Sequence, residues 1–135
     1  MRDPSHLFVY GTLRSDTGTE WARLLASSAQ RFGVGRVRGG LFQLDGYPGM
    51  VLRPDGNEWI TGELYRITDP VSVWPVLDEY EGCGPDDPRP HEFERRVVQV
   101  RREDGTRLSA WAYVYRLDPA GKPRIPSGDY LRSSR

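Results

Sequence analysis

A carboxylate in an unfavourable position is the first candidate for chemistry in this sequence. Over the stretch 70–81, a helical rotation of about 100° per residue places Glu81 on the apolar stripe, between Leu77 and Trp74. Glu81 also ends this predicted helix, where the helix dipole disfavours a negative charge. Burial and the dipole both raise the pKa of a carboxyl group, and general acid–base catalysis uses such groups. Glu81 is therefore a candidate general acid or base.

The same helical spacing leaves an alternative for Glu81. If the helix ends after Tyr80, the Glu81 side chain turns to water or pairs with a nearby arginine such as Arg95. Asp78 and Glu79 fall on or toward the outward side of the predicted helix, where carboxylates are ordinarily solvated. Spacing alone leaves both interpretations of Glu81 open.

The second candidate is a short loop made of Tyr10, Gly11, Thr12 and Leu13. The residues 7–10 before it are apolar without alternation, which is typical of a strand that is covered on both faces. Glycine permits unusual backbone dihedrals and lets a ligand approach the main chain, so this loop can offer backbone N–H groups to an anion or a carbonyl. An ordinary turn is the alternative interpretation.

The last predicted strand contributes aromatic side chains. Alternation places three aromatic residues on one face and three small residues on the other. They are Trp111, Tyr113 and Tyr115 on the aromatic face, and Ala110, Ala112 and Val114 on the small face. The aromatic face can form a pocket wall with phenolic donors, and packing in the core is the alternative.

Other catalytic arrangements find little support in the sequence. His6 and His91 stand alone and Cys83 is distant from both, so no spacing indicates a metal site or a Cys–His pair. The stretch 33–38 begins like a dinucleotide-binding motif, but Arg38 occupies the place of the third glycine and no helix signal follows. We expect no metal and no nucleotide cofactor.

The surrounding elements are predicted from periodicity and turn signals. The stretch 17–28 has a capping-box spacing from Thr17 to Glu20 and then an amphipathic pattern. Glycines divide the apolar stretch 32–44, which indicates two bent strands or one strand with a bulge. Such kinks favour a curled sheet.

The second half of the chain has clearer signals. Asp69 can cap a helix over 70–81, and Gly82 suits the position just past its end, while Pro75 disturbs its first turn. Two strands follow, joined by an Asp-Gly turn at Asp104. The predicted strands are 50–52, 59–67, 93–102 and 107–117, and an irregular C-terminal tail begins at about residue 118. These elements predict an α+β domain whose sheet curls into a small barrel.

Length and composition restrict the class of protein. A chain of 135 residues suits one domain, spanning residues 1–135. Nineteen basic residues balance nineteen acidic ones, so we expect no nucleic-acid or membrane partner. No apolar stretch approaches the roughly 20 residues that a membrane helix needs, and a signal peptide is not evident. The single cysteine agrees with a reducing compartment, so a cytoplasmic protein is expected.

Four separated motifs resemble one known family. They are "FVYGTLR", "GELYRI", "LDEYEG" and "FERRVVQV" followed by "AWAYVY", and the ending "IPSGDY" is also similar. Together they resemble the γ-glutamyl cyclotransferase-like superfamily, which includes γ-glutamylamine cyclotransferases and AIG2-like plant proteins. The resemblance implies a small mixed β-barrel with flanking helices and a cavity at the loop after the first strand.

The resemblance also implies roles for the candidate residues. The loop of residues 10–13 would bind the γ-glutamyl group through backbone amides, and Glu81 would be the acid–base residue. Tyr113 would face the cavity, with Tyr115 as the alternative. The implied substrate is a small γ-glutamyl amide whose own α-amine attacks the γ-carbonyl and releases 5-oxoproline and a free amine. No metal or organic cofactor is needed for this reaction.

Two departures from the family pattern concern the substrate. The expected Tyr-x-Arg is Phe93-Glu94-Arg95 here, which removes a hydroxyl group. The stretch 83–92 is long and rich in proline, and it forms either a lid or a stiff surface loop.

Two other functions are alternatives to the cyclotransferase. One is a non-catalytic small-ligand binding or regulatory module, and the other is an RNA-binding barrel. The sequence leaves the leaving amine and the oligomeric state open.

Overall fold

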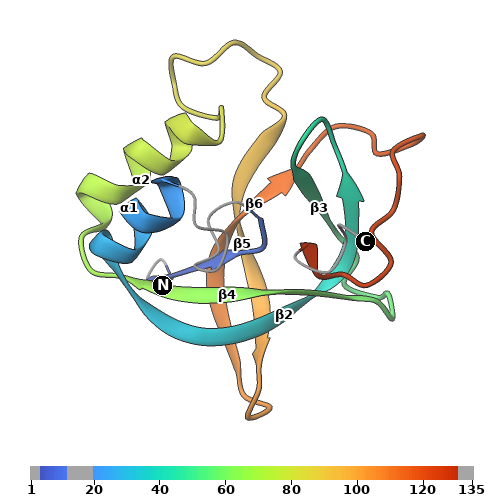
Figure 1. Cartoon of the computed structure of the whole chain (residues 1–135), viewed down its shortest axis with the longest axis horizontal. Coiled ribbons are helices and arrows are strands. Elements are labelled where there is room, and N and C mark those ends of the chain that lie inside the picture. Colours follow the sequence, from blue (N-terminus) through green and yellow to red (C-terminus); the bar gives the residue numbers. More distant parts are fainter. Residues whose placement is uncertain (1–3, 12–19, 131–135) are drawn as a thin grey trace.

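The computed structural model describes residues 4–11 and 20–130 of the chain, in which strands and two helices alternate in an α+β fold (Figure 1). The elements are β1 (His6–Val9), α1 (Glu20–Ser28), β2 (Ala29–Gln43), β3 (Pro48–Leu52), β4 (Trp59–Ile67), α2 (Pro70–Tyr80), β5 (Phe93–Arg102) and β6 (Arg107–Tyr115). In this part of the chain, no helix is long and apolar enough to cross a membrane.

Five of the strands close into a mixed barrel. The order β2-β4-β1-β6-β5 returns to its start because β2 also pairs with β5, at Gly35 and Arg36. Only the pairing of β1 with β6 is parallel among these neighbours, since the others are antiparallel. The last third of β2 leaves the barrel and pairs with β3. The predicted curled barrel is therefore confirmed.

A bend in β2 allows this closure. The stretch with glycines is one strand of 15 residues with an irregular register between Arg31 and Gly33, where Gly33 has φ +136°. The bulge alternative is correct. At Gly35 a side chain would meet Val100 of β5, because a Cβ atom there would lie 2.4 Å from Cγ1 of Val100. Glycine therefore lets the two strands approach and close the barrel.

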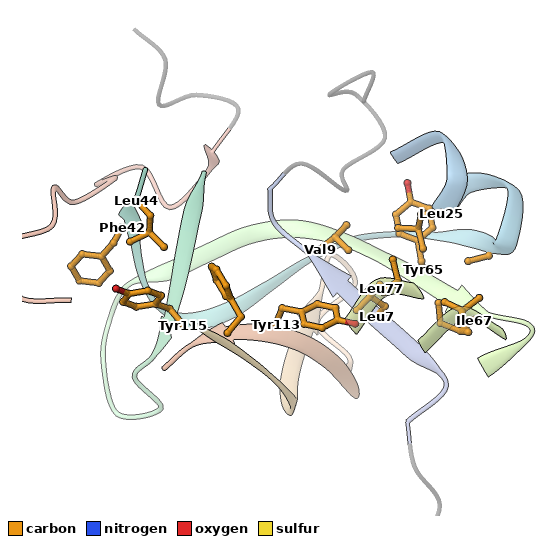
Figure 2. Packing of buried hydrophobic residues seen from close by; sticks show 13 residues of the cluster. Leu7, Val9, Leu25, Phe42, Leu44, Tyr65, Ile67, Leu77, Tyr113 and Tyr115 are labelled. Atoms are coloured by element: carbon orange, nitrogen blue, oxygen red, sulfur yellow. The ribbon is translucent and has the colours of Figure 1, made fainter. Parts of the chain in front are cut away.

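Each face of the sheet packs into its own apolar cluster. One cluster fills the barrel interior with side chains such as Phe8, Leu64 and Ala112. The other lies between the outer face and the two helices and includes Leu7 and Leu77 (Figure 2). Strand β1 contributes to both clusters, so the prediction that it is covered on both faces is confirmed. The alternation along β6 is confirmed as well, because Tyr113 and Tyr115 join the outer cluster while the small residues face the interior.

The helices and turns follow their local signals in part. The predicted amphipathic helix is present as α1, while Thr17 of its capping box lies outside the described residues. Asp69 precedes α2, but its side chain makes no capping hydrogen bond, so the predicted side-chain cap is wrong. Gly105 has φ +86° in the turn between β5 and β6, as the Asp-Gly pair predicts.

The segment after β6 is irregular but attached to the barrel. Ile125 is buried in the interior cluster and donates its backbone N–H to the carbonyl of Leu41. The backbone N–H of Thr61 donates to the carbonyl of Gly128 at 2.7 Å. These contacts cover one end of the barrel beside β3 (Figure 1).

Candidate active site

A cavity of about 510 Å³ opens where β1 ends, a volume that suits a small molecule. The turn before β3, the C-terminal end of α2, the beginning of β5 and a side chain from β6 complete its wall. Its lining residues are Phe8, Val9, Tyr10, Gly11, Gly46, Tyr47, Pro48, Tyr80, Glu81, Gly82, Glu92, Phe93 and Tyr113. The cavity thus brings the adjacent residues Tyr10 and Gly11 together with Glu81 and Tyr113, which are remote from them in the sequence.

The end of α2 places Glu81 in this wall. The helix stops at Tyr80, one residue earlier than predicted, and Glu81 follows with φ −83° and ψ 0°. Gly82 then takes φ +73°. Its N–H donates a hydrogen bond to the carbonyl of Glu79, and the N–H of Cys83 donates one to the carbonyl of Asp78. This pair of bonds is the Schellman motif, which satisfies the last helical carbonyls and directs the chain away. Glu81 is therefore held by the backbone geometry of the helix end.

The carboxyl group of Glu81 is in an unusual electrostatic environment. The residue is half-buried, and burial of its carboxyl group raises its pKa from 4.5 to about 7. The negative charges of Asp78 and then Glu92 raise this pKa further. Near neutral pH such a group is present in both protonation states, so it can accept a proton and return it.

Asp78 turns inward instead of outward, which corrects the interpretation of the helical wheel. Its Oδ1 accepts hydrogen bonds from Nε of Arg95 at 2.8 Å and from the hydroxyl of Tyr113 at 2.7 Å. The ion pair with Arg95 is partly buried, with about a fifth of each side chain exposed. Arg95 therefore pairs with Asp78, and the predicted alternative in which it pairs with Glu81 is not what the structure contains.

Two tryptophans hold Arg95 in position. The guanidinium carbon lies 4.5 Å from the ring centre of Trp74 and 4.7 Å from that of Trp111. Stacking on aromatic faces suits arginine, because its guanidinium is planar and weakly hydrated. This cluster was not predicted from the sequence, although Trp111 on the aromatic face of β6 was the available signal. The arrangement fixes Asp78, and through it the hydroxyl group of Tyr113.

The loop after β1 is described only in part. Tyr10 is buried, and its hydroxyl donates to the carbonyl of Tyr113 at 2.5 Å and accepts from the N–H of Met50 at 3.2 Å. Gly11 lines the cavity, and a Cβ atom there would lie 2.9 Å from Cγ of Pro48. Glycine therefore lets the loop pack closely against Pro48 in the cavity wall. Thr12 and Leu13 lie outside the described residues.

Tyr113 and Tyr115 differ in their positions. Tyr113 lines the cavity, and burial together with the bond to Asp78 raises its pKa well above the usual range. Tyr115 is not among the lining residues and packs edge-to-face on Phe93, with ring centres 5.8 Å apart. Figure 2 shows Tyr115 beside Phe42 at the end of the outer cluster away from the helices. Of the two candidates, Tyr113 is the one that reaches the cavity.

The long stretch 83–92 reaches the cavity only at its end. It extends beyond α2 away from the barrel (Figure 1), and of its residues Glu92 alone lines the cavity. Glu92 accepts a hydrogen bond from the hydroxyl of Tyr47 at 2.5 Å. Burial and this bond raise the pKa of Tyr47 to about 12. Neither residue was predicted from the sequence, because the partners are 45 positions apart and no local pattern marks them.

Metal-binding residues do not gather in the part of the chain that the structure describes. No group of three or more His, Cys, Asp or Glu side chains there is arranged to hold a metal ion. The carboxyl group of Glu81, with its raised pKa, can accept and return a proton in this cavity.

The fold and the cavity together define a class: a small mixed barrel with two helices, whose helix-end carboxyl group faces a pocket beside the first strand. Residues 7–132 match the family described as Gamma-glutamyl cyclotransferase, AIG2-like, and the chain belongs to this family.

Several known proteins are similar to this chain in sequence or in fold. YkqA from Bacillus subtilis is 28% identical over 126 residues, which cover 93% of this chain and 41% of that protein. The crystal structure of YkqA superposes on this chain with a TM-score of 0.65. The chain therefore spans less than half of YkqA. Protein ytfP from Escherichia coli is 31% identical, with 96% of this chain and 99% of that chain covered and a TM-score of 0.63. An AIG2-like protein from Mus musculus shares the fold, at 24% identity, 89% and 84% coverage and a TM-score of 0.68.

Proposed function

We propose that this protein is a γ-glutamyl cyclotransferase that releases 5-oxoproline and a free amine from a small γ-glutamyl amide. The observation that carries the proposal is the carboxyl group of Glu81, whose pKa of about 7 and place in the cavity suit a group that moves protons at neutral pH. Membership of the family supports the same reaction.

In the proposed reaction the substrate's α-amine is the nucleophile. It forms a C–N bond with the γ-carbonyl carbon, which closes a five-membered ring, and the bond from that carbon to the leaving nitrogen breaks. The α-nitrogen loses two protons in total: one passes through Glu81 to the leaving nitrogen and the other exchanges through water. Holding the chain folded for this attack can lower the barrier by about 7–11 kcal/mol.

The loop after β1 is the proposed site of charge stabilisation. The backbone N–H of Gly11, with those of Thr12 and Leu13 implied by the family, would donate to the oxygen that becomes negative as the ring closes. Each such donor contributes roughly 3 kcal/mol in other enzymes. The position of Gly11 in the cavity wall supports this assignment.

The test is release of 5-oxoproline from a panel of γ-glutamyl amides, followed by mass spectrometry. We expect turnover by the natural protein and at least a hundredfold loss in Glu81→Gln, since general acid–base groups contribute about 10²–10⁴-fold. Glu79→Gln is the matched control, because Glu79 is exposed on the same helix end. Full turnover by Glu81→Gln contradicts the role of Glu81, and binding without turnover by the natural protein favours the non-catalytic module.

A further inference from the structure

A second carboxylate, Glu92, faces the cavity that contains Glu81. Both residues line the same space, and Glu92 is half-buried at the point where the chain enters β5. The hydroxyl of Tyr47 donates to its Oε1 at 2.5 Å, which holds the carboxylate in the wall. The proposed reaction needs one carboxylate, so Glu92 is available for another purpose.

The hydroxyl protons of three tyrosines in the cavity wall are already used within the protein. Tyr47 donates to Glu92, Tyr113 donates to Asp78 at 2.7 Å, and Tyr10 donates to the backbone carbonyl of Tyr113. A phenol has one O–H proton, so these hydroxyls can only accept hydrogen bonds from a ligand. These three hydroxyls therefore act as acceptors toward a ligand, where phenolic donors were expected.

The charge of the cavity wall also favours a ligand group that donates hydrogen bonds. Its described lining residues include two carboxyl side chains and no Arg, Lys or His. A leaving amine that carries N–H donors and positive charge is complementary to such a wall, whereas a carboxylate on the leaving amine would face the negative charge of Glu92. One positive group, the substrate's α-ammonium, is accounted for by Glu81 in the proposed reaction. Glu92 can accept a second one.

We propose that Glu92, held by Tyr47, is a specificity-determining residue that binds a positive group on the leaving amine, so that the preferred substrates are γ-glutamyl amides of diamines. This inference rests on the proposed cyclotransferase function and assigns the other half of the substrate. It also gives the end of the long stretch 83–92 a role in substrate choice, while the rest of that stretch lies outside the cavity wall.

The experiment compares three γ-glutamyl amides with leaving amines of similar length and different charge. These are the amides of 1,4-diaminobutane, n-butylamine and 4-aminobutyrate, which carry a positive, no and a negative terminal group. We expect kcat/KM for the diamine amide to exceed that for the butylamine amide at least tenfold, which corresponds to about 1.4 kcal/mol. The 4-aminobutyrate amide should be the poorest substrate, and the differences should be in KM.

Variants then test whether Glu92 is the cause. Glu92→Gln should lose the preference for the diamine amide, so that its kcat/KM values for the diamine and butylamine amides become equal within about twofold, since it removes the charge and little volume. Glu94→Gln is the matched control, because Glu94 is exposed and does not line the cavity. It should behave like the natural protein with all three amides.

The outcomes separate this inference from the proposed function. Equal kcat/KM for the three amides in the natural protein overturns the inference and leaves the cyclotransferase function standing, and this comparison needs no variant. A preference that persists in folded Glu92→Gln also overturns it. If no amide releases 5-oxoproline, the proposed function fails, and binding of the same amides is then measured by calorimetry. Tighter binding of the diamine amide that depends on Glu92 supports the inference about Glu92. Equal binding of the three amides, or no binding, overturns this inference.

Discussion

Replacing Glu81 with Gln is expected to stabilise the protein at alkaline pH while it removes the proposed general base. In the folded protein the Glu81 carboxyl has a pKa of about 7, because it is buried and lies near Asp78 and Glu92. In the unfolded chain its pKa returns to about 4.5. Ionised Glu81 therefore costs folding free energy, and the neutral amide of Gln does not carry this cost.

The sign and size follow from proton binding. Between pH 4.5 and about 7, the folded state retains a proton that the unfolded chain has released, so stability falls as the pH rises through this range. Above about pH 7 the whole cost is present. A pKa raised from 4.5 to about 7 corresponds to about 3 kcal/mol, at about 1.36 kcal/mol for each pKa unit.

The measurement is urea unfolding from about pH 4.5 to 8.5, followed by the fluorescence of the four tryptophans. The free energy of unfolding of Glu81→Gln minus that of the natural protein should grow from under about 0.5 kcal/mol at the acid end to about 3 kcal/mol at the alkaline end. Exposed Glu79→Gln is the control and should show a difference close to zero throughout. A difference for Glu81→Gln that does not change with pH, or a loss of stability at pH 8.5, would refute the reasoning.

Two further predictions concern the same helix end. As a base Glu81 must be ionised, so kcat/KM should rise with pH and reach half its maximum near pH 7. Asp78→Asn removes a negative charge near Glu81 and should therefore move this rise to lower pH. A pH–rate profile that is unchanged in Asp78→Asn counts against the assignment. Gly82→Ala should lower the free energy of unfolding by about 1–2 kcal/mol, because φ +73° is unfavourable for a residue with a Cβ atom. Thermal unfolding measures this loss of stability, with Ser72→Ala as the control because Ser72 is exposed. An equal loss of stability in both variants contradicts the prediction.

Elements with local causes were predictable. The apolar run 7–10, the Asp-Gly turn before β6 and the glycine after α2 act through the backbone preferences and burial of adjacent residues, and each is present where the sequence placed it. The capping role of Asp69 was not predictable in the same way. Residue type makes a side-chain cap possible there, but the backbone dihedrals of the residue decide whether the bond forms.

The inward position of Asp78 shows the limit of a helical wheel. A wheel gives the direction of a side chain from its own helix axis, but it contains no information about what packs beside the helix end. Here β5 brings Arg95 and β6 brings Tyr113, and their donors give Asp78 partners in a partly buried position. A carboxylate with such partners can leave water, whereas one without them stays exposed.

The sequence by itself determined the approximate positions of the helices and of most strands, and the identity of the carboxyl group to suspect, because periodicity and glycine positions act over a few residues. Only the tertiary structure decided the environment of that group. Barrel closure brings Tyr10, Glu92 and Tyr113 around Glu81, and burial together with neighbouring charge raises its pKa. These effects depend on distances between residues that are remote along the chain, so no local pattern contains them.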